Sequence, residues 1–90
     1  MPLYLIEREI PGAGKLTPQE LKEISAKSNE VVARLGVPYK WITSYVVDDA
    51  ICCVHEAPSP EAILRHASRG GFPANKVTEI AAVIGPETGK

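Results

Sequence analysis

The chain has 90 residues, enough for one domain and too few for two, so we predict a single domain over residues 1–90. Ten basic and 11 acidic residues give a net charge of −1, which argues against nucleic acid or an anionic membrane surface as a partner. No apolar run approaches the roughly 20 residues of a membrane span, and the N-terminus lacks the layout of a signal peptide, so we expect a cytoplasmic protein.

The first two elements are a strand and a helix. Residues 3–10, LYLIEREI, are rich in β-forming residues and stop at a Pro-Gly pair, which predicts a strand. Thr17 followed by Glu20, with a proline between them at the first helical position, is typical of a capping box. Apolar residues at helical spacing follow, so we predict a helix over residues 18–35, ended by a glycine.

The rest of the chain predicts a hairpin, a short helix and a last strand. YKWITSYVVDD and AICCVHEA are β-rich runs separated by two aspartates, which indicates a β-hairpin. A Ser-Pro pair at 59–60 begins a second helix, which we expect to end near the glycines at 70–71. KVTEIAAVIG, residues 76–85, predicts a strand, and we expect the tail 86–90 to be disordered.

The order β-α-β-β-α-β is that of the ferredoxin-like α+β fold. It predicts a four-stranded antiparallel sheet with both helices on one face. The other face would be bare, and a chain this short buries little surface by itself, so we expect a homodimer that stacks two bare faces.

Alternation along each strand separates core residues from residues on the bare face. We expect the core to include Tyr4, Ile6, Ile42, Val46, Val54, Ile80, Ala82 and Ile84. With Tyr45 paired to Cys53 and Thr43 to His55, a pocket for a small ligand forms on the bare face. Its expected lining is Glu7, Trp41, Thr43, Tyr45, Cys53, His55 and Glu79. A register shifted by one residue would change these pairs and stays open.

Both cysteines and both histidines lie between residues 51 and 73, yet their spacing matches no zinc motif. Cys52 and Cys53 face opposite ways on a regular strand, so we expect Cys52 in the core and Cys53 in the pocket. His55 is either a metal ligand or a hydrogen-bonded interface residue. His66, at the border of the apolar stripe of the second helix, is either a packing residue or a further ligand.

Several segments together resemble a family of short bacterial nickel-binding proteins over residues 2–86. They are YLIER, SYVVDD, the C-V-x-E-A-P-S-P-E-A-I run, R-H-A, G-F-P and V-T-E-I-A-A-V-I. The resemblance implies a ferredoxin-like fold, a homodimer and nickel binding. The positions that match are Tyr4, Glu7, Trp41, Tyr45, Cys53, Glu56 and His66. Two positions depart, since His55 stands where the family usually has Tyr and Thr43 where it often has His.

Three functions remain open on the sequence. The first is a non-catalytic homodimer that binds a divalent metal, nickel by the resemblance, with His55, Glu7, Glu79 and His66 as candidate ligands. In that reading Trp41, Thr43, Tyr45 and Cys53 line the site. The second is a cofactor-free isomerase or oxygenase with His55 as general base and Tyr45 as orienting donor. The third is an interaction module whose bare face only dimerises.

Overall fold

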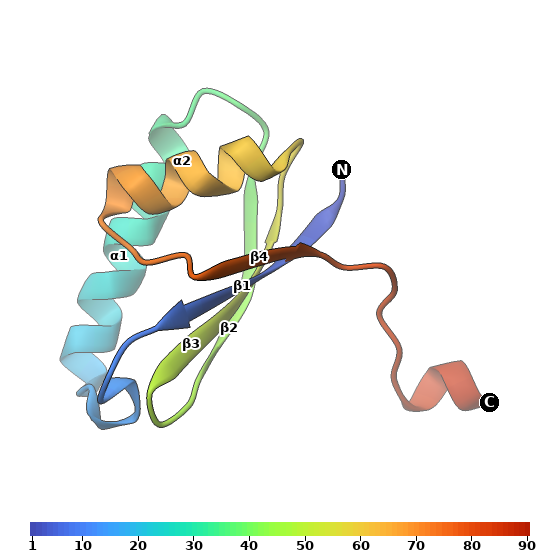
Figure 1. The fold of residues 1–90 in the computed structure, drawn as a ribbon, viewed down its shortest axis with the longest axis horizontal. Coiled ribbons are helices and arrows are strands. Elements are labelled where there is room, and N and C mark those ends of the chain that lie inside the picture. Colours follow the sequence, from blue (N-terminus) through green and yellow to red (C-terminus); the bar gives the residue numbers. More distant parts are fainter.

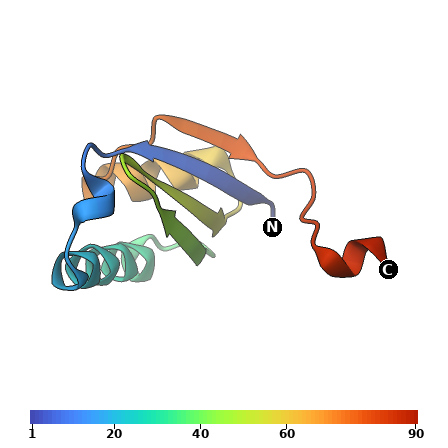
Figure 2. The same ribbon diagram turned by 90° about the horizontal axis from the view of Figure 1, so that it is seen from below.

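The computed structural model describes residues 1–90 and confirms the ferredoxin-like α+β architecture (Figure 1). Its elements are β1 Leu3–Glu9, α1 Pro18–Arg34, β2 Lys40–Val46, β3 Ala50–Glu56, α2 Pro60–Gly70 and β4 Lys76–Glu79. The 3-10 helices η1 Ala13–Lys15 and η2 Pro86–Gly89 complete them. The strands form one antiparallel sheet in the order β2-β3-β1-β4, and both helices lie on one of its faces (Figures 1 and 2). Neither helix is long and apolar enough to cross a membrane.

The predicted capping box starts α1. The Thr17 side chain accepts from the backbone N–H of Glu20, and the Glu20 side chain accepts from the backbone N–H of Thr17. These two bonds satisfy backbone donors that no helical carbonyl can reach. Gly36 follows the helix with φ of 73°, a left-handed conformation that glycine adopts without strain.

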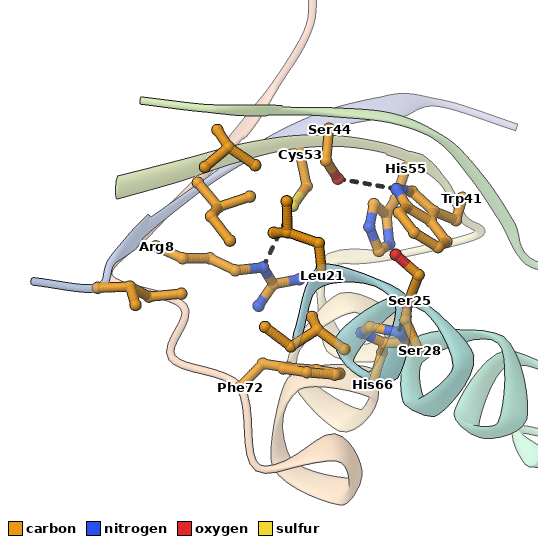
Figure 3. A pocket seen from close by; sticks show the side chains of 14 residues that line it. Arg8, Leu21, Ser25, Ser28, Trp41, Ser44, Cys53, His55, His66 and Phe72 are labelled. Atoms are coloured by element: carbon orange, nitrogen blue, oxygen red, sulfur yellow. Dashed lines mark hydrogen bonds between the residues drawn. The ribbon is translucent and has the colours of Figure 1, made fainter. Parts of the chain in front are cut away.

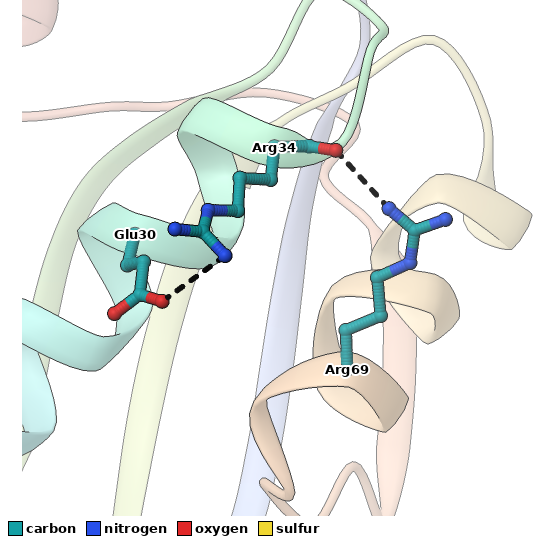
Figure 4. Close-up of polar contacts among 3 residues, drawn as sticks. All are labelled: Glu30, Arg34 and Arg69. Atoms are coloured by element: carbon teal, nitrogen blue, oxygen red, sulfur yellow. Dashed lines mark hydrogen bonds and ion pairs between the residues drawn. The ribbon is translucent and has the colours of Figure 1, made fainter.

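Helix α2 also begins and ends where the sequence predicted. Ser59 accepts from the backbone N–H of Ala62, and Gly71 closes the helix with φ of 70°. Arg69, in its last turn, donates to the backbone carbonyl of Arg34 at the end of α1 (Figure 4). This bond satisfies a terminal carbonyl of α1 and joins the C-terminal ends of the two helices.

The loop after β1 is fastened to the tip of the β2–β3 hairpin. The backbone N–H of Gly12 donates to the Asp49 carboxylate, and the backbone N–H of Gly14 donates to the carbonyl of Asp48. A Cβ on Gly14 would lie 3.1 Å from backbone atoms of the hairpin, so a side chain does not fit there without a shift. The hairpin tip thereby holds the segment that leads into α1.

The register of the hairpin differs from the expected one. Cys53 pairs with Ser44, and Tyr45 pairs with Cys52. A β-bulge between Trp41 and Thr43 inserts one extra residue into β2. Because a bulge reverses the facing of the residues beyond it, Trp41 and Thr43 lie on opposite faces although they are two residues apart.

In β3, the side chains that face the helices are those that were expected on the bare face. Tyr4 pairs with His55 and Ile6 with Cys53, and all four are buried under the helices. The assignment of Tyr4 and Ile6 to the core is confirmed. The assignment of Val54 to the core was wrong, because Val54 pairs with Leu5 on the bare face.

The last strand is shorter than predicted. β4 ends at Glu79, and the chain then leaves the body of the protein in both views (Figures 1 and 2). Val77 faces the core opposite Ile6, the reverse of the expected alternation. Ile42 and Ile84, expected in the core, are 51% and 79% exposed, and Ala82 and Val46 are exposed as well. Ile80 is half-buried, and the tail carries η2, all of whose residues are exposed.

Candidate functional site

A cavity between the sheet and the two helices is lined by both histidines of the chain together with Trp41, Cys53 and Phe72 (Figure 3). Trp41, Cys53 and His55 reach it from β2 and β3, and His66 reaches it from α2. The first three were correctly predicted to lie together, but on the bare face. The altered facing of β3 and the bulge in β2 bring them under the helices, where they meet His66.

His55 is held by a tyrosine from the segment that precedes β2. Its Nδ1 lies 2.5 Å from the hydroxyl oxygen of Tyr39, and the two rings meet edge to face. His55 is 1% exposed, and its Nε2 forms no hydrogen bond with the protein. Tyr39 thus orients the ring and leaves one nitrogen available.

His66 is held by a hydroxyl in the same manner. Its Nε2 lies 3.1 Å from Oγ of Ser28 on α1, and the ring stacks between Tyr39 and Phe72. Its Nδ1 is the one buried side-chain nitrogen or oxygen that has no hydrogen-bond partner. Since buried polar atoms are normally satisfied, this nitrogen is the one that a bound molecule or ion could contact.

The two imidazoles are adjacent and uncharged. Their ring centroids are 5.0 Å apart. Burial, then the neighbouring His66 and the Arg8 guanidinium, lowers the pKa of His55 to about 3. Burial and Arg8 lower the pKa of His66 to about 4. Burial also raises the pKa of Tyr39, so its hydroxyl stays protonated at neutral pH.

The other predicted site residues lie elsewhere. Glu7 and Tyr45 face the bare side of the sheet, where Glu7 pairs with Cys52 and Tyr45 is 63% exposed. Thr43 pairs with Val54, so the expected pairing of Thr43 with His55 was wrong. Glu79 is exposed on β4 opposite Tyr4 and does not line the cavity.

The two imidazoles are of the ligand type that divalent transition metals accept, but two ligands do not complete a coordination shell. Each imidazole can donate through its anchored nitrogen to a hydroxyl and present the lone pair of the other nitrogen, an arrangement typical of metal-bound histidines. Both rings are neutral, as metal ligands must be. No three His, Cys, Asp or Glu side chains converge in a group that could hold a metal ion.

The geometry gives little support to general base catalysis by His55. Tyr45, the expected orienting donor, lies across the sheet, and Tyr39 contacts His55 instead. A base with a pKa of about 3 is poorly matched to proton abstraction at neutral pH.

Arg8, Ser28, Tyr39 and Phe72 are among the residues of the site that were not predicted from the sequence. For two of them, the sequence pattern could have indicated a buried polar position. Arg8 has the same alternation as Tyr4 and Ile6 in β1, and Ser28 interrupts the apolar stripe of α1. A polar residue at a buried position of a regular pattern is a candidate for function, whereas Tyr39 and Phe72 lie outside the regular elements and gave no such signal.

The fold and the cavity define a small ferredoxin-like protein with a buried pair of neutral histidines. Residues 4–80 match the family model described as "Nickel responsive protein SCO4226-like", and the chain belongs to this family. The resemblance found in the sequence is thereby confirmed.

Among solved structures, the chain resembles the crystal structure of SCO4226 from Streptomyces coelicolor A3(2), with a TM-score of 0.76. The match covers 91% of this chain and 99% of the other at 19% sequence identity, which supports the shared fold. No curated protein sequence matches.

Proposed function

We propose that the chain is a non-catalytic homodimer that binds a divalent metal ion, and that the metal is nickel. The observation that carries this proposal is the pair of buried imidazoles, each with one anchored and one free nitrogen. Nickel(II) accepts imidazole nitrogen, and membership in a nickel-responsive family favours it over copper and zinc, which affinity alone would not.

His55 and His66 are the residues that would hold the ion. Two protein ligands give a partial coordination shell, so water has to supply the rest. A site of this kind suits reversible binding by a carrier or sensor rather than a permanent structural centre. Once bound, the metal would supply a positive charge and open coordination positions within the cavity.

The homodimer is proposed because part of the bare face is apolar and no other element of the chain covers it (Figures 1 and 2). Leu3, Leu5 and Val54 lie on it with the exposed ring of Tyr45. The arm after β4 adds Val83 and Ile84, which are 73% and 79% exposed. Apolar surface of this kind usually marks an interface, and a second copy would cover it.

Calorimetric titration of nickel(II) into the metal-free protein at neutral pH tests the proposed metal site. We expect stoichiometric binding by the parent protein. His55→Ala should weaken it at least tenfold, about 1.4 kcal/mol, because water does not replace a neutral imidazole at equal affinity. His66→Ala should have a similar effect, since both rings line the same cavity.

Glu7→Gln and Glu79→Gln serve as controls. Each removes a carboxylate that the sequence suggested as a ligand but that lies outside the cavity, so nickel affinity should be unchanged. If the parent does not bind nickel, the proposed function is wrong. If only the glutamate variants lose binding, the metal site lies outside the cavity.

A further inference from the structure

Arg8 is a buried cation without a counter-ion. It is 4% exposed on the helix-facing side of β1, in the wall of the cavity. The ion pairs of the structure are Glu30–Arg34 and Glu87–Lys90, and neither involves Arg8. Arginine is rarely buried unless it is paired, because removal of the charge from water is costly.

The contacts of Arg8 hold the side chain in place without neutralising it. Its Nε donates to Sγ of Cys53 at 3.4 Å, and its Nη1 donates to the carbonyl of Pro73 at 2.6 Å. The guanidinium also lies over the ring of Phe72, 5.5 Å from the ring centroid. A guanidinium has five N–H donors, so those two bonds leave three without a protein acceptor.

The space beside Arg8 suits a small organic molecule. The cavity encloses about 70 Å³, is partly open to solvent, and is lined by 14 residues of which eight are hydrophobic. Figure 3 shows Arg8 reaching from β1 toward Cys53, with Leu21 of α1 close by and Phe72 beyond. One fixed cation in a mainly apolar cavity is the usual composition of a site for a small ligand with one charged group.

We propose that this cavity binds a small carboxylate with a short aliphatic body, its carboxylate on Arg8 and its body against Leu21, Ile24 and Trp41. The planar guanidinium matches a carboxylate through two parallel hydrogen bonds. The apolar wall favours a hydrocarbon body over an inorganic anion, and a single cation favours a monoanion over phosphate. The site goes beyond the proposed metal function, because it requires no metal.

Butyrate is a suitable probe, and Trp41 reports its binding, since it is the one tryptophan of the chain and lines the cavity. We expect butyrate, added to the full chain in EDTA, to change Trp41 fluorescence in a saturable way and to raise the melting temperature. Butyramide has nearly the same shape without the charge, and should bind at least tenfold more weakly. Because EDTA removes metal, a failure here is distinguishable from a failure of nickel binding.

Two variants and one control locate the site. Arg8→Gln should abolish the saturable response to butyrate. Ser25→Phe keeps Arg8 but places a ring in the cavity, and should also abolish the response to butyrate. This variant tests the site if the Arg8→Gln protein does not fold. Arg65→Gln removes the same charge from an exposed position of α2 that forms no hydrogen bond or ion pair, and should bind butyrate like the parent.

The proposal is overturned if the parent shows no saturable response to butyrate, or if butyramide binds equally well. It is also overturned if a folded Arg8→Gln protein binds butyrate like the parent. Inorganic phosphate should compete at least tenfold more weakly than butyrate, and equal competition would contradict the assignment to an organic monocarboxylate.

Discussion

His55 and His66 show how two ionisable side chains are accommodated inside a domain of this size. Each is 1% exposed, and each forms one hydrogen bond with a hydroxyl. A proton on either ring would leave a positive charge beside Arg8 and beside the other imidazole. The folded protein therefore resists protonation of both rings at pH values where the unfolded chain accepts it.

This difference predicts a pH-dependent stability. In the unfolded chain both histidines titrate near pH 6.5, whereas in the folded protein their pKa values are about 3 and about 4. Between pH 6.5 and pH 4 the unfolded state binds more protons, so the free energy of unfolding falls as the pH falls. Two such groups predict a loss of about 2 kcal/mol between pH 6 and pH 5, with little change above pH 7.5.

Urea unfolding at several pH values measures this slope. His66→Gln removes one of the two groups and should halve it, while carboxylates, which titrate lower, affect both proteins equally. A stability that stays level from pH 7 to pH 5 would mean that the rings can be protonated within the fold.

The neighbouring cysteines are distinguished by the face of the sheet on which they lie. Cys53 is 5% exposed and accepts a hydrogen bond from Arg8, whereas Cys52 is half-buried on the bare face. A thiol reagent should therefore modify Cys52 first in the native protein, the reverse of what the expected alternation implied. Cys52→Ser should remove the fast phase, and Cys53→Ser should leave it. Faster modification of Cys53 would place it at the surface and contradict this facing of β3.

The candidate site could be predicted from the sequence only in its residue types. The grouping of Trp41, Cys53 and His55 follows from their proximity in the hairpin, and was correct. The face of the sheet on which they lie depends on the bulge in β2 and on the strand register. The local pattern does not determine that register, because β3 carries an apolar or small residue at most positions on both faces. His66 was correctly placed on α2, but its partners come from parts of the chain distant in sequence.

At the scale of elements, the helices were predictable because their signals are local. Each N-terminal cap of α1 and α2 is a side chain that accepts a hydrogen bond from the backbone N–H three residues further along the chain. A short segment of sequence therefore contains the whole interaction. The structure places α1 within one residue of the predicted range at its C-terminal end.

The last strand illustrates the opposite case. KVTEIAAVIG has strong β propensity throughout, yet pairing ends at Glu79, opposite Tyr4. β1 begins at Leu3, so only the backbone N–H of Ile80, which donates to the carbonyl of Leu3, still finds a partner there. Strand length was therefore limited by the neighbouring strand, which propensity does not describe.

At the scale of the whole molecule, the two faces of the sheet differ in the side chains that they carry. The helix-covered face holds the cavity with its paired imidazoles and its buried guanidinium. The bare face carries no histidine and no buried charge, and its aliphatic side chains have no layer over them. Association through the bare face would leave the cavity intact, so dimerisation and ligand binding can be tested independently.

The homodimer leads to the last prediction. Sedimentation velocity at micromolar concentration should give twice the 9.7 kDa mass of the chain. Leu5→Arg should produce a folded monomer, because burying a charge at the centre of the bare face against a second copy carries a large desolvation cost. Leu64→Arg places the same charge on the exposed face of α2, where Leu64 is 51% exposed, and should remain dimeric. A monomeric parent would overturn the dimer, and dissociation by Leu64→Arg alone would move the interface to the helices.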